Sequence, residues 1–150
     1  MLRKKTIPSS WYSDKRILKI EKKNIFSKSW HLLGSIDQIP NKGDYLIKTI
    51  NDQPIVVIND MAGVINVFYN VCQHRGCVLL EKDGNSKQIK CGYHGWVYEL
   101  NGKLKAARGF DKEDLDFERL SLKSLEHYIW MKQIFVKLES DCNNLPKTLK

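Results

Sequence analysis

The sequence predicts an all-β, mostly antiparallel domain preceded by one N-terminal α-helix, and three observations support this fold class. Residues 14–29 place their apolar side chains on one side of a helix. From residue 44 onward the segments are short, rich in β-branched and aromatic residues, and separated by turn signals. A chain of 150 residues with 42% hydrophobic content has the size of one ordinary domain and enough apolar side chains for a core.

The predicted helix covers residues 14–29, with lysines around its polar side. We expect Ser13 to cap its N-terminus, where Asp14 suits the positive end of the helix dipole. Gly34 and Pro40 then end the helical pattern. The apolar side of this helix consists of Ile17, Leu18, Ile25 and Phe26.

The strand region contains two expected hairpins. Residues 54–60 and 63–70 form the first, which turns at 59–63. Asn101-Gly102, between VYEL and KLKA, is a strong signal for a two-residue hairpin turn. KDGN at 82–85 marks a further turn, and the segments 121–130 and 133–138 supply the last strands.

The net charge of +8 is concentrated near the N-terminus, where residues 1–30 hold nine Lys or Arg against two acids. These cations lie on a helix and are not interleaved with aromatics, so we expect no nucleic-acid partner. Two interpretations stay open: a solvated helix face, or a surface that steers an acidic redox partner.

We expect a cytoplasmic protein without a membrane partner, because no run approaches the ~20 apolar residues of a membrane span and the N-terminus does not read as a secretory signal. In that compartment the four cysteines point to metal ligands or core residues before disulfides.

Two short segments carry candidate ligands: Cys72-Gln-His74 and Cys91-Gly-Tyr-His94. Sixteen residues separate His74 from Cys91, enough for a hairpin that brings the two loops together. Thiolates favour zinc or iron–sulfur clusters, and zinc sites normally use Cys-x2–4-Cys and His-x3–5-His spacing. Here each pair contains one cysteine and one histidine, which suits two ligands that bind different metal atoms. In a Rieske-type [2Fe–2S] cluster both cysteines bind one iron and both histidines the other.

The neighbours of these ligands are expected to tune or shield the site. Glycines beside the ligands can adopt positive φ, so that their amides point at sulfur. Tyr98 either reaches a cysteine sulfur with its hydroxyl or simply packs in its strand, and Trp96 shields the cluster from water. Three interpretations of Arg75 stay open: it repels protons from the imidazole of His74, pairs with a partner carboxylate, or forms a surface salt bridge. The full set is Arg75, Gly76, Gly92, Gly95, Trp96 and Tyr98.

With these residues in place, the chain resembles the N-terminal Rieske [2Fe–2S] domain of the aromatic ring-hydroxylating (Rieske non-haem iron) oxygenase α-subunit family over nearly its whole length. The matching segments are Phe26 to Trp30, Gly43-Asp44-Tyr45, Pro54-Ile-Val-Val, Asn70-Val-Cys72-Gln-His74-Arg75-Gly76, Cys91-Gly-Tyr93-His94-Gly95-Trp96-Val-Tyr98 and Gly102-Lys-Leu104.

Two residues depart from the family pattern. Gly92 stands where the family usually has proline, which loosens the second loop and leaves both ligands in place. Cys77 falls where Rieske proteins of cytochrome bc complexes place one half of a disulfide, whose other half would stand at Tyr93. We therefore expect Cys77 to be a buried thiol.

The resemblance implies a β-sandwich with cluster loops at 72–77 and 91–96. It divides the chain into a helical extension (1–40), the Rieske domain (41–140) and a tail or start of a linker (141–150). A catalytic site with mononuclear iron needs two histidines and a carboxylate. Only His31 and His127 remain, and we expect both to be structural, so the chain holds no catalytic residue and the mononuclear Fe(II) domain is absent.

The resemblance also implies the function: one-electron transfer through the cluster, as the electron-accepting component of an oxygenase and not a complete oxygenase. A ferredoxin or flavin reductase would donate the electron. The acceptor would be a mononuclear iron in a separate domain or subunit, reached across a subunit boundary in a trimer. The alternatives are a free-standing Rieske ferredoxin and, more remotely, a zinc-stabilised binding module.

Overall fold

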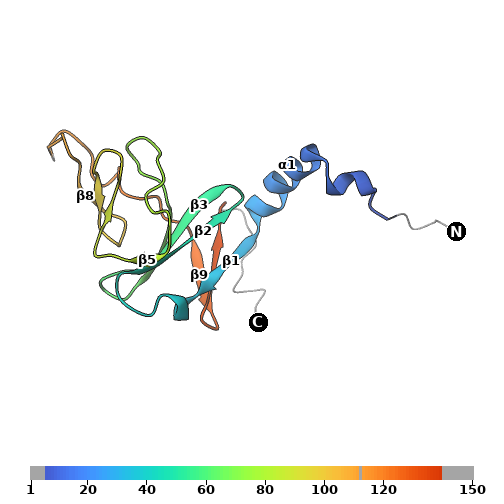
Figure 1. The fold of residues 1–150 in the computed structure, drawn as a ribbon, viewed down its shortest axis with the longest axis horizontal. Coiled ribbons are helices and arrows are strands. Elements are labelled where there is room, and N and C mark those ends of the chain that lie inside the picture. The colour runs from blue at the N-terminus through green and yellow to red at the C-terminus, as the bar shows by residue number, and fades with distance from the viewer. Residues whose placement is uncertain (1–5, 112, 140–150) are drawn as a thin grey trace.

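The strands form three antiparallel sheets in the computed structural model, which describes residues 6–111 and 113–139 (Figure 1). The first sheet has the order β1-β10-β9, the second β4-β3-β2-β5 and the third β6-β7-β8. The strand bounds are β1 Trp30–Ser35, β2 Asp44–Ile50, β3 Gln53–Asn59, β4 Ile65–Tyr69, β5 Gly84–Asn85, β6 Ile89–Lys90, β7 Val97–Tyr98, β8 Leu104–Ala106, β9 His127–Trp130 and β10 Gln133–Lys137. The predicted all-β, mostly antiparallel fold with an N-terminal helix is confirmed.

Strand β3 lies between the two hydrophobic cores of the domain. Its residues Ile55 to Ile58 are all 0% exposed. Successive side chains of a strand point to opposite faces, so Ile55 and Val57 pack with the first sheet, whereas Val56 and Ile58 pack with the third sheet and the cysteine loops. The uninterrupted apolar run of β3 follows from burial on both faces. The second sheet is therefore the middle layer, and the cysteine loops pack against one of its faces.

The N-terminal helix is shorter than predicted. Helix α1 covers Lys15–Asn24, and a short 3-10 turn at Phe26–Lys28 follows it. Asp14, and not Ser13, is the N-cap, since its carboxylate accepts a hydrogen bond of 2.8 Å from the backbone amide of Arg16.

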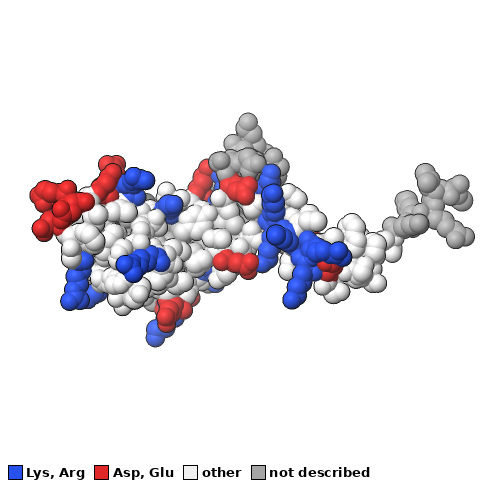
Figure 2. All heavy atoms as spheres, turned by 90° about the horizontal axis from the view of Figure 1, so that it is seen from above, with Lys and Arg blue, Asp and Glu red and all other residues white. Residues whose placement is uncertain are grey.

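The predicted apolar side of the helix is not packed against the described part of the chain. No residue of α1 is buried, and the predicted apolar side chains of Leu18, Ile25 and Phe26 are 45%, 54% and 41% exposed. Figure 1 shows α1 extending away from the sheets. Its attachment lies near its C-terminal end, where Lys22 forms an ion pair with Asp52 and its carbonyl accepts a bond of 3.1 Å from Asn51. On the face shown in Figure 2, a group of Lys and Arg side chains lies around the helix, and others are scattered over the rest of the domain.

No described helix has the length and apolar content required to cross a bilayer. The predicted tail at 141–150 lies outside the described residues. Strand β1, within the predicted extension 1–40, pairs with β10. The division of the chain at residues 40 and 140 stays a prediction.

The hairpin between β3 and β4 is confirmed, whereas the turn at Asn101-Gly102 differs from the prediction. Only Gly102 has a positive φ there, of 87°. The amide of Glu99 donates to the carbonyl of Lys103 (2.8 Å), and the amide of Gly102 donates to the carbonyl of Glu99 (2.9 Å). The loop therefore has three residues, with glycine in the left-handed position, as in a type I turn followed by a bulge.

Two other segments were predicted incompletely. In 121–130 only β9 is a strand, because the preceding stretch crosses between layers: Leu122 packs in the core beside the cysteine loops and Leu125 in the core against the first sheet. In the expected turn at 82–85, two residues form β5 and pair with β2, while Asp83 accepts a bond of 2.7 Å from the amide of Ile47.

The turn between β3 and β4 depends on Asp60, which is 7% exposed. Its carboxylate accepts hydrogen bonds from the amides of Ala62 (2.8 Å) and Val64 (2.9 Å) and from the side chain of Asn66 (2.9 Å). We expect Asp60→Ala to lower the free energy of unfolding by about 2 kcal/mol, since three donors lose their acceptor. Urea unfolding followed by circular dichroism measures this loss. Asp60→Asn keeps one acceptor oxygen and should lose about half as much; equal stability of all three proteins would contradict the prediction.

Candidate metal centre

The two loops that carry the candidate ligands have the same backbone construction. In loop 72–77 the amide of the first residue donates to the carbonyl of the last (2.8 Å), and the amide of Gly76 donates to the carbonyl of Cys72 (2.9 Å). Loop 91–96 repeats both bonds, at 2.8 and 3.1 Å, with Gly95 in the place of Gly76. These two glycines have φ values of 71° and 74°, a region open to glycine without strain. Each loop therefore begins with one candidate cysteine ligand and carries one histidine in its bend, and loop 72–77 also ends in a second cysteine, Cys77.

The amides of Gly76 and Gly95 donate to carbonyls of their own loops, and the expected bonds from the glycines to cluster or cysteine sulfur stay a prediction. Gly92 is exposed, has no positive φ, and a side chain there would meet open space. Two other backbone amides donate hydrogen bonds to the sulfur of Cys91. Burial of Cys91 acts to raise the pKa of its thiol, but hydrogen bonds from the backbone amides of His94 and Tyr93 bring that pKa below its ordinary value.

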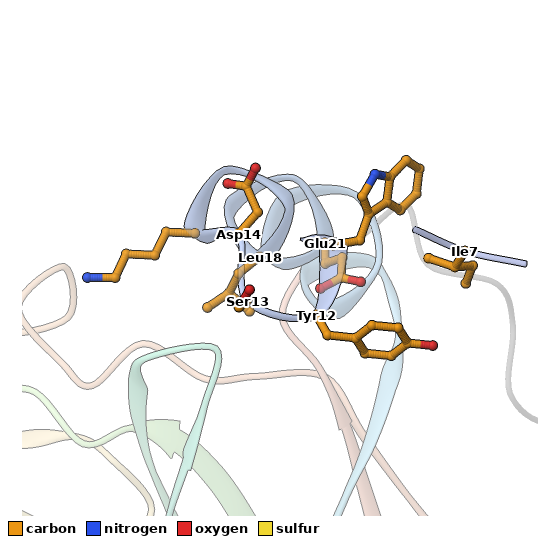
Figure 3. A pocket seen from close by; sticks show the side chains of 8 residues that line it. Ile7, Tyr12, Ser13, Asp14, Leu18 and Glu21 are labelled. Atoms are coloured by element: carbon orange, nitrogen blue, oxygen red, sulfur yellow. The ribbon is translucent and has the colours of Figure 1, made fainter. Parts of the chain in front are cut away.

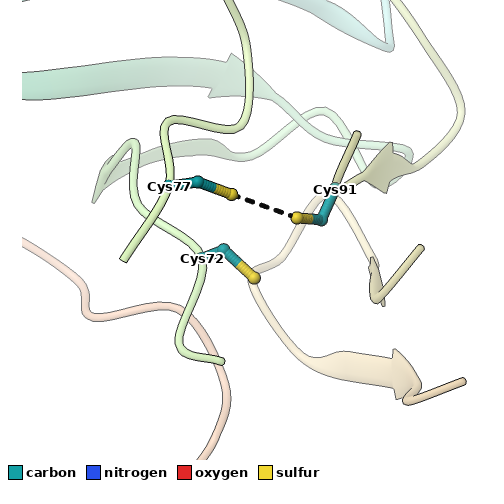
Figure 4. Close-up of side chains that lie close together, drawn as sticks. All are labelled: Cys72, Cys77 and Cys91. Carbon is teal, nitrogen blue, oxygen red and sulfur yellow. Dashed lines mark hydrogen bonds between the residues drawn. The ribbon is translucent and has the colours of Figure 1, made fainter. Parts of the chain in front are cut away.

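Three sulfur atoms gather between the loops (Figure 4). Those of Cys72, Cys77 and Cys91 lie within 4.8 Å of one another, and all three cysteines are free. Cys72 and Cys91 are 1% and 2% exposed, and Cys77 is partly buried. Two sulfurs on one tetrahedral metal, with bonds of about 2.3 Å, lie about 3.8 Å apart. The upper limit of 4.8 Å between these sulfurs leaves room for two of them to share a metal atom.

The two loop histidines form a second pair. Their ring centroids lie 4.7 Å apart, and the Nδ1 atoms of His74 and His94 are buried without a hydrogen-bond partner. A buried polar atom without a partner costs about 1–3 kcal/mol, so a structure rarely keeps one without a role for it. By contrast, one ring nitrogen of His31 and one of His127 lie 2.5 and 3.3 Å from backbone carbonyl oxygens. The two Nδ1 atoms of the loops are suited to bind a metal.

The sulfurs and the imidazoles are separate groups. Among the described residues, no histidine nitrogen belongs to the set of atoms that surrounds the sulfurs within 4.8 Å. A single zinc ion with two cysteines and two histidines would draw all four ligand atoms around one point. The arrangement instead suits two metal atoms, one on the sulfur side and one on the imidazole side.

His74 is kept neutral by its surroundings. Burial, followed by electrostatic interaction with the neighbouring His94 and Arg75, lowers the pKa of His74 below its ordinary value. A neutral imidazole is the form that binds metal. Arg75 itself is exposed and forms no ion pair with other described residues.

Aromatic side chains surround the histidines. Trp96 is 2% exposed and stacks on the ring of His74, with centroids 4.7 Å apart and planes at 6°. Phe110 meets Trp96 edge-on at 6.4 Å, and Tyr93 lies 3.7 Å from His94. Trp96 thus covers one face of His74 and excludes water from it. No role at the centre was predicted for Tyr93 or Phe110 from the sequence, because their positions depend on loop geometry.

Tyr98 combines both of the alternatives expected for it. It is 0% exposed within the core, and its hydroxyl oxygen lies 3.4 Å from the sulfur of Cys72. The same oxygen accepts a bond of 3.0 Å from the amide of Gln73, which leaves the hydroxyl proton free to donate to sulfur. Burial, followed by the contact with Cys72, raises the pKa of Tyr98 well above its ordinary value, so the hydroxyl keeps its proton.

A hollow of about 260 Å³ on α1 is remote from these loops (Figure 3). Ile7, Tyr12 and Leu18 give it apolar walls. Its carboxylate Asp14 is already paired with Arg16, at 2.8 Å. This hollow contributes nothing to the metal centre.

Comparison with known proteins shows the family to which the chain belongs. The model of the Rieske [2Fe–2S] domain family matches residues 29–126. The glycine betaine monooxygenase oxygenase subunit of Chromohalobacter salexigens is 39% identical over 119 residues, which are 79% of this chain and 27% of the relative. The carnitine monooxygenase oxygenase subunit of Escherichia coli K12 is 33% identical over 148 residues, or 96% of this chain and 39% of the relative.

Solved structures agree. The quaternary ammonium Rieske monooxygenase CntA with L-carnitine has a TM-score of 0.86 at 31% identity, over 96% of this chain and 42% of that chain. Naphthalene 1,2-dioxygenase from Rhodococcus sp. has a TM-score of 0.89 at 28% identity, over 96% and 34%. The chain spans about a quarter to two fifths of the curated relatives it matches. It belongs to the Rieske [2Fe–2S] domain family, and its cofactor is a [2Fe–2S] cluster.

Proposed function

We propose that Cys72 and Cys91 bind one iron of the cluster, that His74 and His94 bind the other, and that the domain transfers single electrons within a Rieske non-haem iron oxygenase. One observation carries the ligand assignment: two buried imidazole Nδ1 atoms without partners stand beside, but apart from, a group of cysteine sulfurs. The cluster, once bound, supplies a centre that takes up and releases one electron at a time.

The side chains of the domain give the site two unequal ends. Cys72 and Cys91 are almost fully buried, whereas His74 and His94 are partly exposed. The imidazole end therefore lies nearer the surface and is the proposed route for electrons. The stacked Trp96 restrains His74 and keeps water from one face of that route. Tyr98 donates to the sulfur of Cys72 at the buried end.

The proposed donor is a ferredoxin or flavin reductase, and the proposed acceptor is the mononuclear iron of a catalytic domain, in the same protein or a neighbouring subunit of a trimer. The cited relatives are oxygenase subunits, which favours this role over a free-standing carrier. The domain itself does not select a substrate, since monooxygenases of quaternary ammonium compounds and naphthalene dioxygenase share its fold.

The cofactor and the role are tested together on protein purified without oxygen. We expect two irons and two acid-labile sulfides per chain, and a Rieske-type EPR signal after reduction with dithionite. A reductase with its ferredoxin should then reduce the cluster in an NADH-dependent assay. Colourless protein with one zinc per chain, even after cluster reconstitution, would contradict the proposal.

A further inference from the structure

Cys77 is a third sulfur at the centre that the proposed ligand set does not use. Its Sγ lies 3.3 Å from the Sγ of Cys91, within hydrogen-bond distance for sulfur (Figure 4). It is partly buried and packs against the core beside the cysteine loops. Its backbone is fixed as well, because its carbonyl accepts a bond of 2.8 Å from the amide of Cys72. The thiol is therefore held against Cys91 by the fold of its loop.

The direction of this contact follows from the chemistry of the two sulfurs, and it rests on the proposed ligand assignment. A cysteine that binds iron does so as a thiolate and has no proton to give. A cysteine that binds no metal is an ordinary thiol, which is protonated at neutral pH. Of the two sulfurs, only Cys77 can donate.

Tyr98 makes the corresponding contact at the other ligand sulfur. Its hydroxyl lies 3.4 Å from the Sγ of Cys72. Each ligand sulfur thus has one side-chain donor: Tyr98, from strand β7, for Cys72, and Cys77, from the opposite loop, for Cys91. Trp96, which holds the same place in the second loop as Cys77 in the first, offers no donor to sulfur, and its indole nitrogen is without a partner.

We propose that the thiol of Cys77 donates a hydrogen bond to the ligand sulfur of Cys91 and thereby raises the reduction potential of the cluster. Reduction adds negative charge, part of which falls on the ligand sulfurs, and a donor stabilises that charge more in the reduced state than in the oxidised one. A thiol is a weak donor. Cys77 therefore contributes less than Tyr98 and acts as a positioning residue, not as a ligand.

The test is the reduction potential of the cluster-loaded protein, measured by anaerobic titration with EPR detection. We expect Cys77→Ala to lower the potential and Cys77→Ser to return it to the parent value or above, because a hydroxyl donates at least as strongly as a thiol. Tyr98→Phe should lower it further than Cys77→Ala. Val78→Ala, at the exposed neighbouring position, serves as the control and should leave the potential unchanged.

Two results would overturn the proposal: a Cys77→Ala protein with the parent potential, or equal shifts in the alanine and serine variants, which would indicate packing alone. The EPR signal and iron content of the parent protein distinguish a failure of this proposal from a failure of the proposed function. A parent without a two-iron signal would reject the ligand assignment, whereas a two-iron parent with an unchanged Cys77→Ala variant would reject the hydrogen bond only.

Discussion

Cys91→Ser is expected to remove the cluster almost entirely, so that bound iron falls from two atoms per chain to near zero. Cys91 supplies one of two thiolates proposed for the same iron, and it lies at the base of a loop whose amides stabilise its charged form. A serine hydroxyl is a far poorer ligand for iron than a thiolate, because it is harder and keeps its proton. Iron and sulfide analysis of protein reconstituted without oxygen, together with its visible absorption, measures the loss.

Cys77→Ser is the matched control, since its sulfur lies only 3.3 Å from that of Cys91. The three sulfurs form one group, yet the proposed assignment requires only two of them. The control variant should therefore retain two irons per chain and the Rieske-type EPR signal. If Cys77→Ser lost its iron while Cys91→Ser kept it, the ligand assignment would be wrong.

The candidate centre could be predicted from the sequence because its ligands lie in two short segments. The mixed Cys/His spacing alone indicated two metal atoms, and the separation of sulfurs from imidazoles agrees with that reading. The contact between Cys77 and Cys91 was not predicted. It depends on how the two loops face each other in the fold, which the sequence of either loop alone does not give.

The turns between the strands were predicted only in part. The hairpin between β3 and β4, with Gly63 in its turn, was predicted, whereas the loop at Asn101-Gly102 has three residues and not two. Asn51 and Asp52 form the tight turn between β2 and β3 with φ values of 51° and 64°. Met131 and Lys132 form the turn between β9 and β10 at 46° and 65°. Methionine and lysine have no intrinsic preference for that region, so the pairing of the flanking strands must impose it. The sequence of the turn itself therefore does not predict the backbone conformation of Met131 and Lys132.

For the N-terminal helix, the sequence predicted the element but not the surface that covers it. A helix was predicted and α1 forms, but two of the four residues of its predicted apolar side, Ile25 and Phe26, lie beyond its end. Periodicity says only that an apolar side exists. Which surface covers that side depends on the rest of the fold, and the described residues leave Leu18 and Ile25 about half exposed.

Gly102→Ala is expected to lower the free energy of unfolding by roughly 2–4 kcal/mol, from a strained backbone and a steric clash together. Gly102 has a φ of 87°, and a Cβ there would lie 2.5 Å from Cε1 and 2.7 Å from Cζ of Phe68. The ring of Phe68 is 4% exposed in the core beside the cysteine loops, so it cannot move aside freely. Urea unfolding of cluster-loaded protein measures the effect.

Gly63→Ala separates the two causes, because Gly63 has the same φ of 87° and the nearest atom to its Cβ would be Cε of Lys42, at 3.9 Å. Only the backbone cost, about 1–2 kcal/mol, should remain in that variant. The difference between the two variants then reports the clash with Phe68, about 1–3 kcal/mol. Equal losses of unfolding free energy in the two variants would mean that the ring of Phe68 moves aside without cost. The core beneath β7 and the cysteine loops would then be less tightly packed than its burial indicates.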